Sequence, residues 1–133
     1  MEVLKLNQSY IEEIENNITE ENCLLISNIL DNIENEMSYG LLDNKNNLVG
    51  VIDFGYYDDG DINDAIINNI VIFDNNQGKG YGKMLLCSSF KKEFGVEFKG
   101  RLYADALHNG VRGFYEKLGF YNIENYMYVK EFK

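Results

Sequence analysis

The chain has 133 residues, of which 45% are hydrophobic and 14% are aromatic. This length and composition are typical of one globular domain with a buried core, and they exclude an intrinsically disordered chain. Lysine and arginine together number 12 and aspartate and glutamate 22, so the net charge is −10. That charge argues against nucleic acid as a partner and favours a cationic one. In a second interpretation, which stays open, the acidity only maintains solubility.

The sequence shows no sign of a membrane span, a disulfide or a metal site. Its first residues lack a basic stretch followed by an apolar one, and no apolar run approaches the roughly 18 residues of a span. We therefore expect a cytoplasmic protein with no membrane partner. Cys23 and Cys87 each lie in an apolar helical pattern, which predicts buried free thiols, and His108 has no partner at metal-ligand spacing.

The first half of the chain alternates between strand and helix patterns. A first strand is expected at residues 2–6, followed by helices at residues 9–16 and 20–35. The second helix carries four apolar residues that share one face: Leu24, Leu25, Ile29 and Ile33. Three strands joined by turns rich in aspartate, asparagine and glycine are then expected at residues 39–42, 48–57 and 65–73.

The second half predicts a long helix, a strand, a short helix and a last strand. The long helix has apolar residues at intervals of three or four, expected to face a sheet: Met84, Cys87, Phe90 and Phe94. The later elements are expected at residues 100–107, 111–120 and 125–132. The whole order predicts an α/β fold in which a mixed, mostly antiparallel sheet has helices on both faces, in one domain spanning residues 1–133.

The segment "QGKGYG" places Gly78, Gly80 and Gly82 where a helix is expected to begin. Each glycine costs the helix about 0.5–1 kcal/mol relative to alanine, so function rather than folding is expected to require bare backbone there. The N–H groups and partial positive charge of a helix N-terminus bind anions such as a diphosphate. Lys79 and Lys83 add positive charge to the turn. In the alternative interpretation the glycines form an idle loop.

Two better-known glycine motifs do not fit this turn. A P-loop continues from Gly-Lys to serine or threonine, whereas Met84 follows Lys83 here. The dinucleotide motif G-x-G-x-x-G has Lys83 at its last position. The strand before the turn is also expected in an antiparallel meander rather than in a βαβ unit.

Two segments resemble the GNAT superfamily of N-acetyltransferases. Residues 77–82, "QGKGYG", resemble its Gln/Arg-x-x-Gly-x-Gly/Ala acetyl-CoA signature, and residues 108–120, "HNGVRGFYEKLGF", are similar to its Asn-then-Phe-Tyr-Glu-Lys-Leu-Gly-Phe segment. The resemblance implies an enzyme in which a primary amine directly attacks the thioester of acetyl-CoA. A non-catalytic acyl-CoA-binding module of the same fold is the alternative.

The resemblance also assigns residues to the cofactor. In the family, the strand before the turn splays from its neighbour, its backbone contacts pantetheine, and one N–H faces the thioester oxygen. By position these roles are implied for Ile70, Val71 and Ile72. The diphosphate is expected on the backbone of the turn: Gly78, Lys79, Gly80, Tyr81, Gly82 and Lys83. Asn109 matches a cofactor-contacting asparagine, or alternatively caps the next helix.

Two catalytic residues are implied in the same way. An alkyl ammonium is almost fully protonated at neutral pH, and removing its proton costs roughly 4 kcal/mol. Ile66 stands where some relatives carry a glutamate, which leaves Asp105 and Asp64 as candidate bases. We favour Asp105, although a solvated aspartate at a strand end is the alternative. Tyr115 matches the tyrosine that protonates the leaving thiolate, and packing on the sheet is its alternative role.

The acceptor is expected to be a cationic amine. An anionic rim on the loop before the fourth strand supports this: Asp58, Asp59, Asp61 and Asp64. The alternative is a solvated hairpin tip. The first two helices and residues 122–126 are expected to complete the acceptor surface, and a homodimer stays open.

Overall fold

The computed structural model describes residues 1–35, 37–57, 63–106 and 112–133. Its elements in chain order are β1 (Glu2–Lys5), α1 (Ile11–Glu15), α2 (Cys23–Asn32), β2 (Ser38–Leu42), β3 (Leu48–Tyr56), β4 (Asp64–Ile72), α3 (Tyr81–Phe94), β5 (Gly100–Asp105), α4 (Arg112–Lys117), β6 (Tyr121–Glu124) and β7 (Met127–Phe132). Short 3₁₀ turns lie at Gln8–Tyr10, Ile33–Asn35 and Asp74–Asn76. No helix among these residues is long and apolar enough to cross a membrane.

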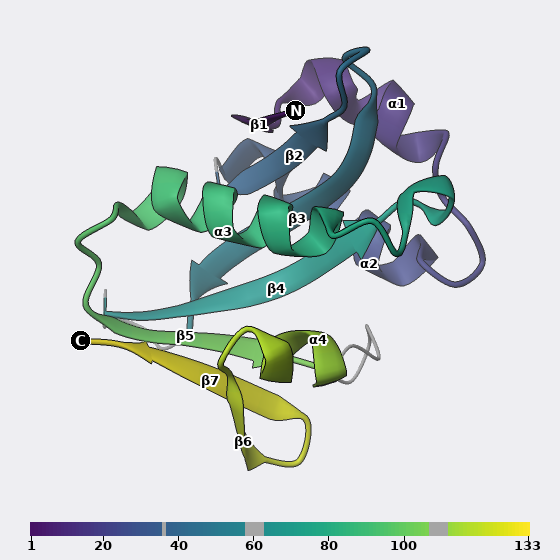
Figure 1. Cartoon of the computed structure of the whole chain (residues 1–133). Coiled ribbons are helices and arrows are strands. Elements are labelled where there is room, and N and C mark those ends of the chain that lie inside the picture. The colour runs from purple at the N-terminus through teal and green to yellow at the C-terminus, as the bar shows by residue number, and fades with distance from the viewer. Residues whose placement is uncertain (36, 58–62, 107–111) are drawn as a thin grey trace.

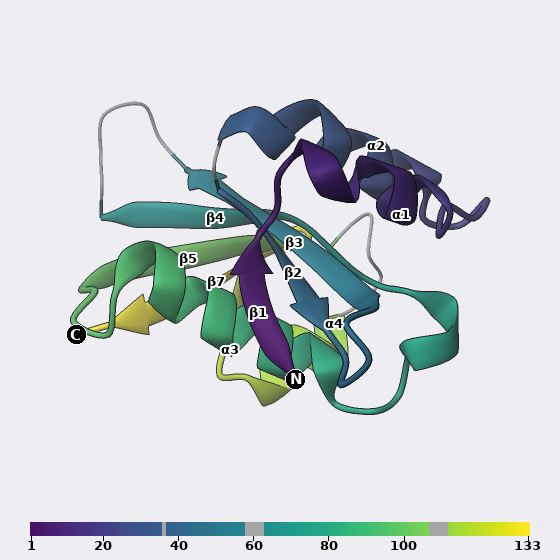
Figure 2. The same cartoon turned by 90° about the horizontal axis from the view of Figure 1, so that it is seen from above.

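The strands form one seven-stranded sheet in the order β1-β2-β3-β4-β5-β7-β6. Helices α1 and α2 cover one face, and α3 and α4 cover the other (Figure 1 and Figure 2). The predicted mixed sheet with helices on both faces is therefore confirmed. The pattern did not predict β6, because it has only four residues and all four of its side chains are exposed.

Two apolar clusters hold the helices on the sheet. Successive strand residues alternate between them, so that Ile52 and Ile70 pack toward α3 whereas Val51 and Val71 pack toward α1 and α2. Every residue of β2 is buried, as are the first seven of β3. Strands covered on both faces read as continuous apolar runs, which explains why their existence was clear from the sequence.

The predicted helix faces are right in part: Leu25, Ile29 and Ile33 are buried as expected, as is Phe90, but other members are exposed. Leu24 is 55% exposed, and α2 instead buries Leu25, Ile26 and Ile29. Met84 is 41% exposed, and α3 instead buries Leu85, Leu86, Ser89 and Phe90. A spacing of three or four residues fits two neighbouring faces of a helix equally well, so the choice between them depended on packing.

The cysteines lie outside the core. Cys23 and Cys87 are both free and exposed, so the prediction of buried thiols is wrong. Each occupies a helix face adjacent to the buried one. Among the described residues, no group of three or more potential ligands could hold a metal ion.

Strand β4 has different partners on its two sides. It pairs antiparallel with β3 along its length and parallel with β5, to which α3 connects it. The expected meander is thus only half of the arrangement, because β4, α3 and β5 also form a βαβ unit. Pairing with β5 runs from Asp64↔Arg101 to Ile67↔Ala104 and stops there, although β4 continues to Ile72. Figure 1 shows the two strands diverging beyond this point.

A bulge in β4 coincides with the divergence. Asp53 of β3 lies opposite Asn69, but the next residue, Phe54, lies opposite Ile67, so Asn68 is an extra residue in β4. A bulge bends its strand and increases the local twist. The bend therefore turns the end of β4 away from β5 and leaves residues 68–72 with an edge that no described strand pairs with, which we call the open edge.

Gly100 sets the close approach of β5 to the start of β4. Its φ is +152°, and an added Cβ would lie 2.1 Å from the carbonyl oxygen of Asn63, which accepts a hydrogen bond from the Arg101 N–H at 2.8 Å. We expect Gly100→Ala to lower the unfolding free energy by about 2–3 kcal/mol, because only backbone movement relieves the overlap. Urea denaturation measures the change.

The matched control is Gly113→Ala in α4. An added Cβ there meets nothing within 4 Å, so this variant should be more stable by about 0.5–1 kcal/mol. If both alanine variants gained stability, the close approach at Gly100 would be disproved.

Candidate active site

The first turn of α3 lies against both α4 and the end of β4. A Cβ added to Gly82 would lie 3.0 Å from Cε1 of Phe114 and 3.8 Å from Cγ1 of Ile72. The bare backbone at Gly82 thus has a packing role, because it lets α4 approach α3. The same contact brings three predicted parts of the site together: the open edge, the glycine turn and the helix that carries Tyr115.

The open edge exposes alternate backbone groups of β4. The N–H of Phe73 donates to Val49 of β3 at 2.9 Å, so by alternation the backbone of Val71 also faces β3. The N–H and C=O of Ile70 and Ile72 point the other way. Gln77 Nε2 donates to the Ile72 carbonyl at 3.0 Å, which agrees with this direction. The structure therefore brings the backbones of Ile70 and Ile72 to the open edge, but not that of Val71.

The glycine turn adopts a conformation that suits glycine. Gly78 and Gly80 have φ values of +78° and +80°, and an added Cβ would meet nothing within 4 Å at either. Gly80 is also the N-cap of α3, with no side-chain cap. The left-handed backbone gives these glycines a reason in folding that the sequence analysis did not foresee, and the space in front of the turn is open.

The start of α3 has the features of an anion site. The first N–H groups of a helix have no intrahelical partner, which applies here to Tyr81, Gly82 and Lys83. Lys79 and Lys83 are exposed beside them. A diphosphate approaching the turn would meet free donors, two cations and no side chain at Gly80.

Tyr115 is fully buried in α4. Its ring packs against Phe114, Phe120 and Tyr128, with centroid separations of 5.3, 5.2 and 6.4 Å. The packing role considered for this residue is therefore real. Its acid role stays a prediction, supported in position by the neighbouring Phe114, which contacts the first turn of α3.

Asp105 lies at the point where β4 and β5 separate. It directly follows Ala104, the last residue of β5 that pairs with β4. It also lines a cavity of about 240 Å³ with Tyr57 and the β6–β7 hairpin. The hairpin residues of this cavity are Ile123, Glu124, Asn125, Tyr126 and Met127. The structure thus joins the favoured base to the segment at residues 122–126 that was expected to contact the acceptor.

Asp64 lies at the opposite end of β4 from the open edge. Its two carboxylate oxygens accept hydrogen bonds from Nε and Nη2 of Arg101, both at 3.0 Å. This ion pair joins β4 to β5 where they are still paired, so Asp64 is not a base for a reaction at the open edge. Asn109 and the other rim aspartates, Asp58, Asp59 and Asp61, lie outside the described residues.

The sequence analysis missed a buried polar row beside the bulge. Ser38, Asp53 and Asn69 lie side by side on β2, β3 and β4, and they are 1%, 1% and 4% exposed. Asn69 Nδ2 donates to Asp53 Oδ1 at 3.0 Å, and Asn28 Nδ2 of α2 donates to Asn69 Oδ1 at 3.4 Å. The available signal was the aspartate inside the apolar run "LVGVIDF".

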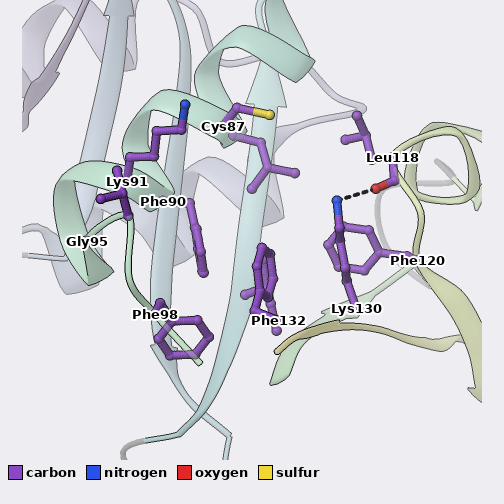
Figure 3. A pocket seen from close by; sticks show the side chains of 12 residues that line it. Cys87, Phe90, Lys91, Gly95, Phe98, Leu118, Phe120, Lys130 and Phe132 are labelled. Carbon is purple, nitrogen blue, oxygen red and sulfur yellow. Dashed lines mark hydrogen bonds between the residues drawn. The ribbon is translucent and has the colours of Figure 1, made fainter. Parts of the chain in front are cut away.

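A second cavity, of about 180 Å³, lies beside the C-terminal half of α3 (Figure 3). Its walls are mainly apolar, with Phe90, Phe98 and Phe132 among them, and they include no carboxylate. Lys130 reaches its rim and donates to the Leu118 carbonyl at 2.7 Å. None of the predicted site residues that the structure describes lines this cavity, so it is separate from the described part of the candidate site.

Comparison with known proteins identifies a family. The family model described as "Acetyltransferase (GNAT) domain" matches residues 35–122. No curated protein matches the chain. A GNAT-family acetyltransferase from Staphylococcus aureus Mu50 is similar in structure, with a TM-score of 0.72, 18% identity and 99% of each chain covered.

Two further solved structures share the fold. A GNAT-family acetyltransferase from Brucella melitensis in complex with acetyl-CoA has a TM-score of 0.73 and 14% identity, covering 99% of this chain and 88% of that one. N-acetylglutamate synthase from Neisseria gonorrhoeae, complexed with coenzyme A and N-acetyl-glutamate, has a TM-score of 0.75 and 17% identity, covering 98% of this chain and 34% of that one. At these identities the likeness establishes the fold.

The buried carboxyl of Asp53 makes stability depend on pH. Burial raises its pKa above the usual range, although hydrogen bonds from Asn69 and Asn32 oppose the shift. The folded state therefore favours the protonated carboxyl. Its contribution to the unfolding free energy is fully present below the unfolded-state pKa of about 3.9 and is lost as the pH rises through the folded-state pKa. We expect Asp53→Asn to remove this loss of unfolding free energy, which amounts to about 1.4 kcal/mol per unit of difference between the folded and unfolded pKa. Urea denaturation across this pH range measures it.

Asp31→Asn is the control, because Asp31 is an exposed aspartate of the same helix that supplies Asn32. It should leave the pH profile of wild type unchanged. If the unfolding free energy of Asp53→Asn varied with pH in the same way as that of wild type, the raised pKa of the buried Asp53 carboxyl would be contradicted.

Proposed function

Because the chain belongs to the acetyltransferase (GNAT) family of acyltransferases, we propose that it transfers an acetyl group from acetyl-CoA to a primary amine. The observation that carries the proposal is the open edge of β4 beside the first turn of α3. An extended pantetheine arm pairs with an unpaired strand edge, and a helix N-terminus holds a diphosphate. The two features lie next to each other here, as one cofactor molecule requires.

The cofactor's contacts follow from these backbone directions. The backbone groups of Ile70 and the N–H of Ile72 bind pantetheine, because Gln77 already occupies the Ile72 carbonyl, and the Ile70 N–H, nearest the point of divergence, faces the thioester oxygen. The diphosphate binds the amides of residues 78–83, with Lys79 and Lys83 adding charge. The contact of Asn109 remains a proposal from the family resemblance.

The reaction needs a base, an oxyanion donor and an acid. Asp105 removes a proton from the acceptor ammonium, and the neutral nitrogen attacks the thioester carbon. Charge develops on the carbonyl oxygen, where the Ile70 N–H stabilises it. The carbon–sulfur bond then breaks, the leaving thiolate takes a proton from Tyr115, and the nitrogen loses its second proton to solvent, from which Tyr115 is reprotonated while Asp105 releases its own proton. The products are the acetylated amine and coenzyme A.

The acceptor binds in the cavity that Asp105 lines. Asp105 and Glu124 supply two carboxylates to its wall, whereas the rings of Tyr57 and Tyr126 already pack on Tyr103 and against the Arg112 guanidinium. Carboxylates attract cations. With the net charge of −10, this lining supports a cationic amine as the acceptor class.

A non-catalytic acyl-CoA-binding module is the second candidate. Two observations favour it: Tyr115 is fully buried, and Ile66 replaces a possible carboxylate on β4. Such a protein would bind acetyl-CoA without releasing coenzyme A. A single domain, a cytoplasmic location, a homodimer and the lack of a nucleic acid partner all stay predictions.

Calorimetry and an amine panel test the proposed function. Acetyl-CoA should bind at a ratio of about 1:1, and cationic amines should release coenzyme A faster than neutral or acidic ones. The apparent affinity for the amine should fall as salt rises, since charges are screened within about 8 Å at physiological ionic strength. Failure to bind millimolar acetyl-CoA would disprove the function, and binding without turnover across the panel would favour the non-catalytic module.

Gly80→Asn tests the glycine turn. Asparagine tolerates the left-handed backbone better than other side chains, so stability should change little, whereas valine at φ +80° would strain the fold. The new side chain would stand before the helix N-terminus and weaken acetyl-CoA binding about tenfold or more in calorimetry.

Gly95→Asn at the other end of α3 is the control. Its φ of +85° and ψ of +162° suit only glycine, so this variant should lose stability while keeping cofactor affinity. Unchanged affinity in Gly80→Asn would restore the idle-loop interpretation of the turn.

Tyr115→Phe tests the general acid. Turnover should fall by roughly 10²-fold, the lower part of the usual range, because a thiolate leaves tolerably well without help. Acetyl-CoA affinity should stay within about twofold, since the hydroxyl acts only as sulfur departs. The defect should shrink at high pH, where free thiolate needs no proton, and steady-state kinetics with a true acceptor measures it.

Tyr128→Phe is the matched control, because it removes a hydroxyl from the buried ring that packs on Tyr115. Its turnover should match wild type. Full turnover in Tyr115→Phe, with chemistry rate-limiting, would make Tyr115 a packing residue.

A further inference from the structure

The polar row of Ser38, Asp53 and Asn69 is an unexpected group to bury beneath a helix. Oδ2 of Asp53 and Oγ of Ser38 have no hydrogen-bond partner among the described residues. A buried polar atom without a partner lowers stability, and an apolar side chain at position 53 would avoid that cost. The fold therefore retains a carboxyl where packing alone would favour removing it.

The row lies directly beside the bulge that creates the open edge. Asp53 is the last residue of β3 before the register shift, and Asn69 lies opposite it. Asn69 contacts the Asp53 carboxyl through its side chain and through its backbone. Because a bulge disrupts the ladder of backbone hydrogen bonds, a side-chain acceptor at this point holds a segment that the ladder leaves loose.

The segment held in this way leads into the proposed reaction centre. Ile70 directly follows Asn69, and its backbone groups face the open edge. A peptide plane is rigid, so the orientation of Asn69 sets the direction of the Ile70 N–H. An error in that direction would move the donor away from the developing oxyanion, where small displacements are costly.

We propose that Asp53 is a positioning residue for acetyl transfer, whose carboxylate fixes Asn69 and the β4 bulge so that the Ile70 N–H points at the thioester oxygen. The inference rests on the proposed function. Among the described residues, Asn32, Ser38 and Asn69 face Asp53 from α2, β2 and β4, and all three side chains are neutral. The carboxylate thus acts through hydrogen bonds rather than through an ion pair.

A pair of ligands separates positioning from general structural support. Acetyl-CoA has a carbonyl oxygen for the Ile70 N–H, whereas its thioether analogue S-ethyl-CoA has none. Wild type should bind acetyl-CoA more tightly than S-ethyl-CoA. Asp53→Asn should lower this preference at least fivefold and turnover at least tenfold, while the melting temperature at neutral pH does not fall. Asp31→Asn, the exposed control, should change none of these quantities.

The outcomes decide the inference directly. An unchanged preference and turnover in Asp53→Asn would overturn it, and so would an equal loss of affinity for both ligands, which indicates a structural role. If Asp53→Asn does not fold, Asn69→Ala replaces it, because that variant keeps the carboxyl and removes the side chain it holds. The same loss of preference is expected.

A measurement without cofactor separates this inference from the proposed function. In NMR spectra of the free protein, the amide resonances of Asn69 and Ile70 should shift as Asp53 titrates, and Asp53→Asn should abolish the shift. If the chemical shifts of these amides did not change as Asp53 titrates, the inference would be overturned even if acetyl-CoA binds. If wild type fails to bind acetyl-CoA, the proposed function fails, while the titration still decides whether Asp53 holds the bulge.

Discussion

The bulge at Asn68 is the constraint on which the site depends. A strand that pairs along its full length on both sides has no free backbone groups, and β4 would be such a strand if it stayed straight. One extra residue bends it away from β5 after Ile67, while pairing with β3 continues to the end of the strand. The unpaired edge therefore lies in the middle of the sheet rather than on an outer strand, with helices on both faces of the sheet and other strands on either side.

The elements around the open edge pack closely, and glycines make this packing possible. Gly82 has no side chain, so α4 can approach the first turn of α3, and Gly78 and Gly80 take the left-handed conformations that the turn requires. The buried carboxyl of Asp53, on β3, lies on the opposite face of the sheet from these glycines. Residues that weaken a helix or bury a polar atom therefore gather around one short segment, as is usual where function rather than stability selects the side chain.

The two faces of the sheet have different chemistry at the point of divergence. The face toward α3 offers free N–H groups and lysines, which suit an anionic cofactor. Asp105 and Glu124 line the cavity at the end of β5, and carboxylates suit a cation. Opposite charges placed on either side of one gap in the sheet would bring a polyanionic donor and a cationic acceptor together from different directions.

Apart from strand β6, the element order was determined by the sequence itself, as were the glycine turn and the family, because these depend on local patterns such as "QGKGYG" and on continuous apolar strands. Tertiary structure alone decided the rest. Local spacing could not distinguish the Met84 face of α3 from the Leu85 face, or reveal that Asp64 is paired with Arg101, since each depends on what lies across the sheet. The bulge and the role of Asp53 were equally out of reach, because register belongs to two strands at once and is not encoded in either alone.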